Sequence, residues 1–161
     1  MSNNKRLFKR ILFIALSLVV ITGIVFAGRA IGGVIKRSSE IREIEKRYPD
    51  ATITPSGLRY IVLEQGYGPK PIAGRKVLIN YTGTLLNGHV FDSSDDQGRS
   101  LEFEAGVGQT IRGFDEAVMD MREGEKRLIM IPPDLGYGSR SVGSVPGNSL
   151  ILFELELFRI K

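Results

Sequence analysis

The stretch KVLINYTGTLLNGHVFDSS, residues 76–94, decides the fold class of this chain. Val77, Ile79 and Tyr81 fall at every second position, which predicts a strand over residues 76–85 with one buried face. The pair Asn87-Gly88 supplies the backbone freedom that a tight hairpin turn requires. The stretch therefore predicts a strand that turns back on itself in an antiparallel sheet.

The pattern continues on both sides of this hairpin. Phe114, Ala117, Val118 and Met121 lie on one face of a short helix, which residues 122–124 end. Further strands are predicted over residues 58–64, 101–104, 125–131 and 149–160. Several antiparallel strands with one amphipathic helix predict an α+β domain over residues 57–161, with the sheet wrapped around the helix.

Composition excludes several classes of function. The chain has 161 residues, of which 42% are hydrophobic and 25% charged, and this suits one domain with its own core. It has no cysteine and a single histidine, His89, so disulfide frameworks, thiolate zinc sites, cysteine nucleophiles and multi-histidine metal sites are excluded. Phosphate-binding and serine-nucleophile motifs are also missing. The sequence predicts neither a metal nor a cofactor.

The positive charge of the chain belongs to its N-terminus. The formal net charge is +4, but residues 1–37 carry seven of the 22 Lys and Arg residues and none of the 18 Asp and Glu residues. The remainder therefore has 15 basic against 18 acidic side chains. Since nucleic-acid binding needs clustered Lys and Arg on the folded surface, no nucleic-acid partner is predicted.

An uncharged run from Ile11 to Ala27 predicts a membrane segment over residues 11–28. As a helix it would span about 26 Å, close to the ~30 Å of a bilayer core. Basic residues precede it, so residues 1–10 are expected in the cytoplasm and the domain outside it, in a bacterial periplasm or on the extracellular side. A cleaved signal peptide is the alternative, and it would export the domain as well.

Residues 29–56 are predicted to be a spacer with a short helix from Ser38 to Tyr48. Ser38 or Ser39 is the expected N-cap, and Glu43 and Arg47 can form an i, i+4 ion pair. Pro49 is expected to end the helix.

From about Gly57 onwards the sequence resembles the FKBP-type peptidyl-prolyl cis-trans isomerases, the macrolide-binding immunophilins. Five blocks in family order carry the resemblance. They are Val77 to Leu85 (VLINYTGTL), Gly88 to Ser94 (GHVFDSS), Thr110 to Phe114 (TIRGF), Ile131 to Gly138 (IPPDLGYG) and Leu150 to Leu157 (LILFELEL). The family fold, an antiparallel sheet around a short helix, matches the fold predicted from periodicity.

The resemblance implies an isomerase that binds proline-containing polypeptides in an aromatic pocket and needs no cofactor. The resemblance implies three catalytic residues, Asp92, Tyr137 and Ile111. Asp92 would lie beside the twisting amide, while the Tyr137 hydroxyl and the Ile111 backbone N–H would donate hydrogen bonds to substrate carbonyls. Phe114 would form the pocket floor. The implied substrate-binding residues are Tyr81, Phe91, Leu101, Thr110, Phe114, Val145 and Phe153.

Three departures from the family pattern predict altered substrate preference or macrolide affinity. Phe114 occupies a floor position that is often Trp, Leu101 replaces an aromatic wall residue, and the loop over residues 138–149 is one residue shorter than in the best-known members. The expected function is folding of exported proteins by a monomeric isomerase, with macrolide inhibitors as further ligands. A membrane-tethered binding module or chaperone with little isomerase activity is the alternative.

Overall fold

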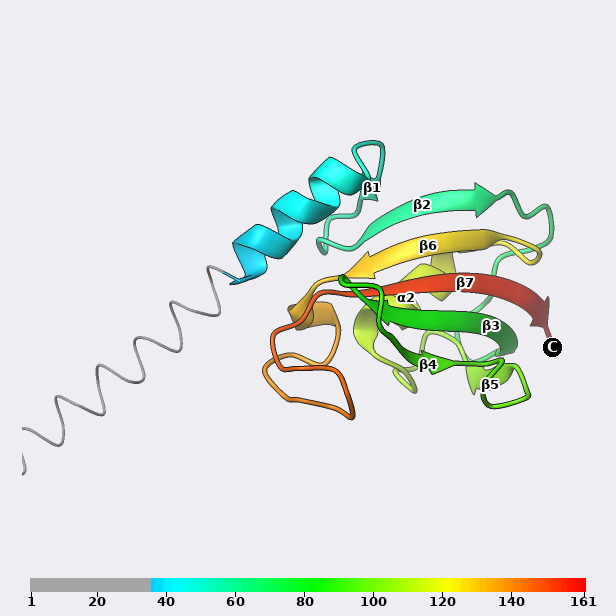
Figure 1. The fold of residues 1–161 in the computed structure, drawn as a ribbon. Coiled ribbons are helices and arrows are strands. Elements are labelled where there is room, and N and C mark those ends of the chain that lie inside the picture. The colour runs from blue at the N-terminus through cyan, green and yellow to red at the C-terminus, as the bar shows by residue number, and fades with distance from the viewer. Residues whose placement is uncertain (1–35) are drawn as a thin grey trace, which may run out of the picture. The chain divides into compact units, whose positions relative to one another are not determined.

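The computed structural model describes residues 36–161. Its strands form one antiparallel sheet in the order β1-β2-β6-β7-β3-β4, and β5 pairs with the other half of the β3 edge that β4 uses (Figure 1). The strands are β1 (Thr52–Ile53), β2 (Arg59–Glu64), β3 (Lys76–Leu85), β4 (Val90–Ser93), β5 (Leu101–Glu104), β6 (Lys126–Ile131) and β7 (Ile151–Ile160).

The helix α2 (Arg112–Asp120) packs against one face of this sheet (Figure 1). Phe114, Ala117 and Val118 are buried on the face of the helix that the periodicity predicted. They share a core cluster with inward-facing residues of the central strands, such as Ile79 and Leu155. Full burial of one such aliphatic side chain contributes about 1.5–3 kcal/mol. The predicted α+β fold is therefore confirmed.

Most predicted elements agree with the structure to within two residues. The strands predicted over 76–85 and 101–104 match β3 and β5, and the Asn87-Gly88 turn joins β3 to β4. Two short elements were not predicted, the edge strand β1 and the 3-10 turn η1 (Pro133–Leu135). Both have three residues or fewer, which is too short for a periodic pattern.

Residues 36–47 are helical, and this helix ends before Pro49 as predicted. The predicted ion pair between Glu43 and Arg47 is confirmed, with 2.9 Å between Oε1 and Nη2. The predicted N-cap at Ser38 or Ser39 is wrong, because residues 36 and 37 are already helical and both serines lie inside the helix.

Ser39–Lys161 forms one compact unit, which includes part of the segment assigned to the spacer. We call residues 39–47 the docked helix. Its Ile44 is 0% exposed and packs with Met130, Leu150 and Leu152 in a second core cluster, separate from the one that contains α2. The sheet is therefore covered on both faces over part of its area.

No helix within residues 36–161 is long and apolar enough to cross a membrane. The predicted tail (1–10), the predicted membrane segment (11–28) and the start of the spacer lie outside the described residues.

Candidate functional site

The site begins where β4, β3 and β7 lie side by side. Gly83 of β3 is in register with Asp92 of β4 and with Phe153 of β7. A Cβ atom at position 83 would lie 2.7 Å from ring atoms of both Phe91 and Phe153. Because real Cβ atoms essentially never approach so closely, only glycine leaves room for these two rings.

Four of the predicted pocket residues form a continuous aromatic cluster. The ring centroid of Phe114 lies 5.3 Å from that of Phe153 and 6.0 Å from that of Tyr81, and Phe91 lies 5.5 Å from Phe153. These three pairs have nearly perpendicular rings, a favoured geometry worth about 0.5–1.5 kcal/mol per pair. Phe114 is 3% exposed while Phe91 is half-buried, so the cluster is deepest at the start of α2.

Phe103 was missed by the sequence analysis. It lies on β5, is buried, and its ring centroid is 5.9 Å from that of Phe114. It therefore supports the Phe114 ring from the core side. The alternation of Leu101 and Phe103 in the predicted strand was the available signal. Leu101 itself is half-buried against the same core cluster.

A ring of three hydrogen bonds fixes the polar side of the cluster. The Tyr81 hydroxyl donates to Asp92 Oδ2 at 2.7 Å. Gln97 Nε2 donates to Asp92 Oδ1 at 2.9 Å and to the Tyr81 hydroxyl oxygen at 3.0 Å. Both carboxylate oxygens are thus held by neutral donors. Gln97 follows β4 in an irregular loop, where no sequence pattern marked it.

The two tyrosines at the site have raised pKa values. Burial, followed by the hydrogen bond to Asp92, raises the pKa of the Tyr81 hydroxyl well above its usual value. Burial and the negative charge of Asp92 also raise the pKa of Tyr137. Both hydroxyls therefore stay protonated at neutral pH. No hydrogen bond engages the Tyr137 hydroxyl within the described part of the chain, so it is available as a donor.

The segment that precedes α2 presents a backbone donor. Ile111 is extended (φ −63°, ψ 146°) and its carbonyl accepts from Phe114 N–H at 3.0 Å. Its own N–H has no backbone partner among residues 36–161. The buried Asp115 carboxylate accepts from the N–H groups of Gly106 and Gly108 at 2.7 and 2.9 Å, and so anchors the loop that leads to Ile111. The adjacent Thr110 is half-buried.

The loop over residues 138–149 forms the remaining side of the site. It starts after the half-buried Tyr137 and is closed by the Asn148 N–H, which donates to the Gly138 carbonyl at 2.8 Å. Val145 is buried in the core cluster and forms a bridge with Val142. Eight of the ten predicted site residues thus belong to, or pack against, the core that contains the aromatic cluster, and Asp92 is hydrogen-bonded to Tyr81 of that cluster. The tenth, Thr110, directly precedes Ile111 in the chain.

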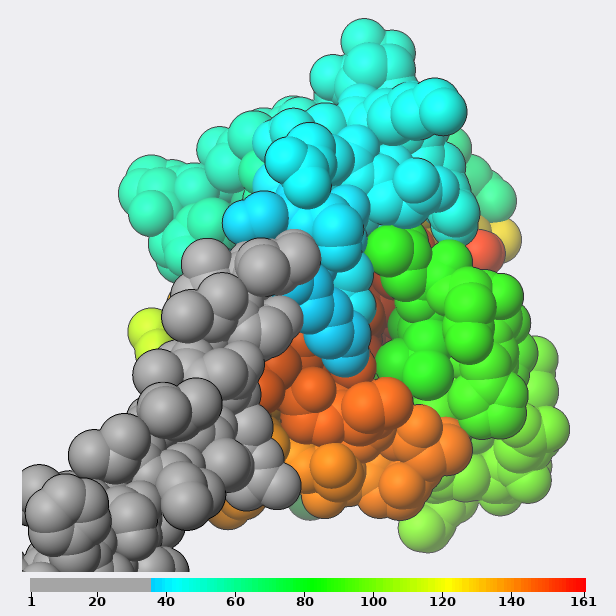
Figure 2. Space-filling model, turned by 60° about the vertical axis from the view of Figure 1, so that its left-hand side comes forward, coloured from blue at the N-terminus to red at the C-terminus, as the bar shows by residue number. Residues whose placement is uncertain are grey.

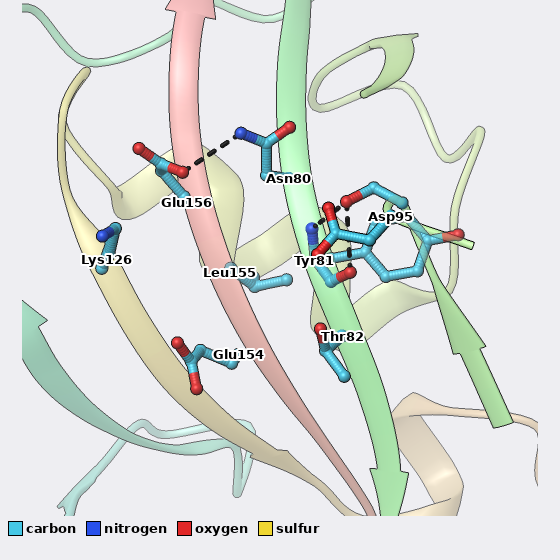
Figure 3. A pocket seen from close by; sticks show the side chains of 9 residues that line it. Asn80, Tyr81, Thr82, Asp95, Lys126, Glu154, Leu155 and Glu156 are labelled. Atoms are coloured by element: carbon cyan, nitrogen blue, oxygen red, sulfur yellow. Dashed lines mark hydrogen bonds between the residues drawn. The ribbon is translucent and has the colours of Figure 1, made fainter. Parts of the chain in front are cut away.

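A separate pocket of about 280 Å³ lies on the other face of β3 and β7. Figure 3 shows Asn80, Thr82, Glu154 and Glu156 around it, with Lys126 on the neighbouring β6. Its lining is charged and polar, so it does not suit an apolar ring. Within residues 36–161 no group of three His, Cys, Asp or Glu side chains is placed to hold a metal ion.

The chemistry available at the aromatic cluster is non-covalent. Tyr137 and the Ile111 N–H are donors, Asp92 is an acceptor, and the rings provide an apolar surface. The one histidine, His89, is exposed and contacts the Ser144 hydroxyl at 3.2 Å; within the described residues no carboxylate orients its ring. A serine-histidine nucleophile is therefore not formed. The site can bind a small apolar ring and the carbonyl groups on either side of it.

The sequence matches a model of the FKBP-type peptidyl-prolyl cis-trans isomerase family over residues 68–158. FK506-binding protein 2 of Dictyostelium discoideum is 53% identical over 92 residues, which cover 56% of this chain and 69% of that protein. An FK506-binding protein of Neisseria meningitidis serogroup A is 42% identical over 99 residues, which cover 61% of this chain and 91% of the relative.

Solved structures show the same fold. The crystal structure of AtFKBP13 superposes with a TM-score of 0.68 at 36% identity, over 70% of this chain and 99% of that chain. The crystal structure of FkpA from Escherichia coli gives a TM-score of 0.75 at 28% identity, over 100% of this chain and 74% of that chain.

Proposed function

Because this chain belongs to the FKBP-type peptidyl-prolyl cis-trans isomerases, we propose that it rotates X-Pro peptide bonds at the aromatic cluster around Phe114. The cluster supports this proposal, since the rings of Tyr81, Phe114 and Phe153 are in contact, Tyr137 and Ile111 pack against the same core, and Asp92 is hydrogen-bonded to Tyr81. The proline ring of the substrate lies on Phe114, between Phe153 and Tyr81.

The polar groups hold the peptide on either side of that ring. The Ile111 N–H and the Tyr137 hydroxyl donate to substrate carbonyls, and Asp92 lies beside the rotating amide. Tyr81 acts through Asp92, because its hydroxyl fixes one of the two carboxylate oxygens. Leu101, Val145 and Phe91 complete the apolar lining, and Thr110 adds a buried hydroxyl beside Ile111.

This site lowers the rotation barrier without forming a covalent bond. Twisting an X-Pro amide breaks its resonance, and the barrier of about 18–20 kcal/mol makes the uncatalysed reaction slow. The planar amide has more charge separation than the twisted one, so an apolar pocket disfavours the ground state more than the transition state. An acceleration of about 10⁴-fold requires only ~5.5 kcal/mol from all of these contacts together.

The test is the rate of cis-trans exchange in an X-Pro peptide with the full chain and with a Tyr137→Phe, Asp92→Ala double variant. The double variant loses a hydroxyl donor and a carboxylate, so kcat/KM is expected to fall roughly 100-fold. Gln65→Ala, at an exposed position, is the matched control and keeps the parental rate. Parental activity in the double variant would reject this site. A parent chain that is folded but inactive would favour the alternative function, a binding module with little isomerase activity.

We further propose that FK506-type macrolides bind in the same pocket. The names of two relatives state that those proteins bind FK506. The smaller platform of Phe114 and the aliphatic Leu101 predict weaker binding than in members with larger aromatic rings at these positions. Competition between such a macrolide and the peptide in the exchange assay tests this extension.

We also propose that residues 11–28 anchor the chain in a membrane and that the isomerase acts on exported proteins outside the cytoplasm. The uncharged run and the basic residues before it support this arrangement. Because the chain lacks cysteine, Gln65→Cys should react with a membrane-impermeant thiol reagent on intact cells, and Ser2→Cys should not. Labelling of neither position, or a mature N-terminus near residue 28, would contradict the anchored topology.

A further inference from the structure

The docked helix is attached to the sheet by an apolar anchor. Ile44 is 0% exposed and packs with Leu150 and Leu152, while the half-buried Leu86 and Tyr48 pack against the same cluster. An exposed helix used only as a spacer has no reason to bury a side chain completely. This helix also lies outside the segment 68–158 that matches the family.

Two polar contacts extend the attachment to particular backbone groups. The Leu150 N–H donates to Glu40 Oε2 at 3.1 Å, and Arg47 Nη1 donates to the Leu86 carbonyl at 3.2 Å. Glu40 and Arg47 are seven residues apart in the docked helix, so the two contacts hold residues 39–47 at two separate points. Figure 2 shows the blue-to-cyan surface of the docked helix in contact with both the orange and the green parts of the surface.

Both backbone groups belong to segments that frame the aromatic site. Leu150 immediately follows the loop 138–149, which contains Val145 and begins after Tyr137. Leu86 begins the turn that leads to Phe91 and Asp92.

The two segments also meet each other, because His89 of the turn contacts Ser144 of the loop at 3.2 Å. The docked helix, the hairpin turn and the loop thus form a closed ring of contacts. Strand β7 adds a direct link, since Leu152 packs in the cluster of Ile44 while the next residue, Phe153, packs in the aromatic cluster.

We propose that the docked helix is a positioning element of the isomerase, with Glu40, Ile44 and Arg47 holding the loop 138–149 and the hairpin turn in the geometry that binds the peptide. None of the three touches the substrate. They act through Leu86 and Leu150, and therefore on the placement of Val145 and Tyr137. This inference rests on the site proposed above.

The experiment compares the full chain with Ile44→Ala in two assays. The first measures hydrogen exchange of the protein's backbone amides, and the second measures the rate of cis-trans isomerisation of an X-Pro peptide. The reporter amides are Val145 and Asn148, which are hydrogen-bonded within the loop. If the helix holds the loop, Ile44→Ala speeds exchange at these amides about tenfold, corresponding to local opening. The variant should also raise KM several-fold with a smaller change in kcat. The reason is that a displaced loop loses contacts made equally with the bound peptide and with the transition state.

Two controls separate positioning from general destabilisation. Leu157→Ala removes an equally buried side chain at the far end of β7, so it lowers global stability without opening the loop selectively. Lys46→Ala alters an exposed position of the same helix and leaves both readouts unchanged. Glu40→Gln weakens the contact with Leu150 while keeping the core intact. It replaces Ile44→Ala as the test variant if Ile44→Ala does not fold.

The outcomes are distinct. Loop exchange and KM that change in Ile44→Ala or Glu40→Gln, and not in Leu157→Ala, support the proposal. Loop exchange that rises equally in Ile44→Ala and Leu157→Ala overturns it, as does a parental KM in Glu40→Gln and Ile44→Ala. An inactive parent whose loop exchange still responds to Ile44→Ala would reject the proposed site while leaving the structural attachment intact.

Discussion

Gly83 shows how a single residue sets the shape of the site. It is in register with Asp92 and Phe153, and its missing side chain provides the space that Phe91 and Phe153 fill. The contacts that a Cβ would make are with ring atoms on both sides. The Phe153 ring cannot move away without disturbing Phe114, whose ring centroid lies 5.3 Å from it.

We therefore expect Gly83→Ala to displace the two rings and to lower kcat/KM at least about tenfold, mainly through KM. Overpacking of this kind costs roughly 1–3 kcal/mol of folding free energy. Peptide exchange kinetics and a thermal melt measure the two effects. Thr82→Ala, at the half-buried neighbouring position on the other face of β3, should change kcat/KM less than about twofold, because its side chain does not contact the aromatic rings. Equal activity in Gly83→Ala and the parent would show that the rings adjust freely.

Arg127 connects three secondary-structure elements through one side chain. It lies on β6, its side chain is 5% exposed, and it pairs with Glu125 at 2.6 Å and with Asp120 of α2 at 3.0 Å. Its guanidinium also lies 4.1 Å from the ring centroid of Tyr60 on β2. Lys70 pairs with the same Asp120, but from an exposed position.

These two cations give a matched pair of predictions about stability. Arg127→Met leaves the buried Glu125 without a counter-charge and should cost about 3–5 kcal/mol. Lys70→Ala removes an exposed ion pair and should cost at most ~1 kcal/mol. Urea unfolding of both variants measures the difference. Similar losses of unfolding free energy in the two variants would show that burial does not set the strength of these ion pairs.

Over the whole molecule, the sequence predicted those parts that depend on periodicity. The alternation in residues 76–85 and 149–160 and the stripe of Phe114, Ala117 and Val118 identified the main strands and the helix. Each pattern reports which face of an element is buried, and burial is what dominates the stability of these elements. The site residues came instead from the resemblance of five blocks to one family.

The features that the sequence did not reveal depend on contacts between distant segments. Gln97 lies in an irregular loop, so its two hydrogen bonds to Tyr81 and Asp92 follow only from the path of the chain. Ile44 lies in the helix predicted from Ser38 to Tyr48, but nothing in that prediction identified the surface of Leu150 and Leu152 that covers it. Sequence periodicity predicts that a residue is buried, but it does not identify the residues that it packs against.

The positions of Tyr81 and Tyr137 give the molecule an optical property of its own. The chain has no tryptophan and five tyrosines, so its ultraviolet emission comes from tyrosine alone. One of those five, Tyr81, belongs to the aromatic cluster and donates a hydrogen bond to the Asp92 carboxylate, and a second, Tyr137, packs against the same core. A peptide bound at the proposed site would change the surroundings of both rings at once. The unlabelled protein is therefore expected to report peptide binding through its intrinsic fluorescence.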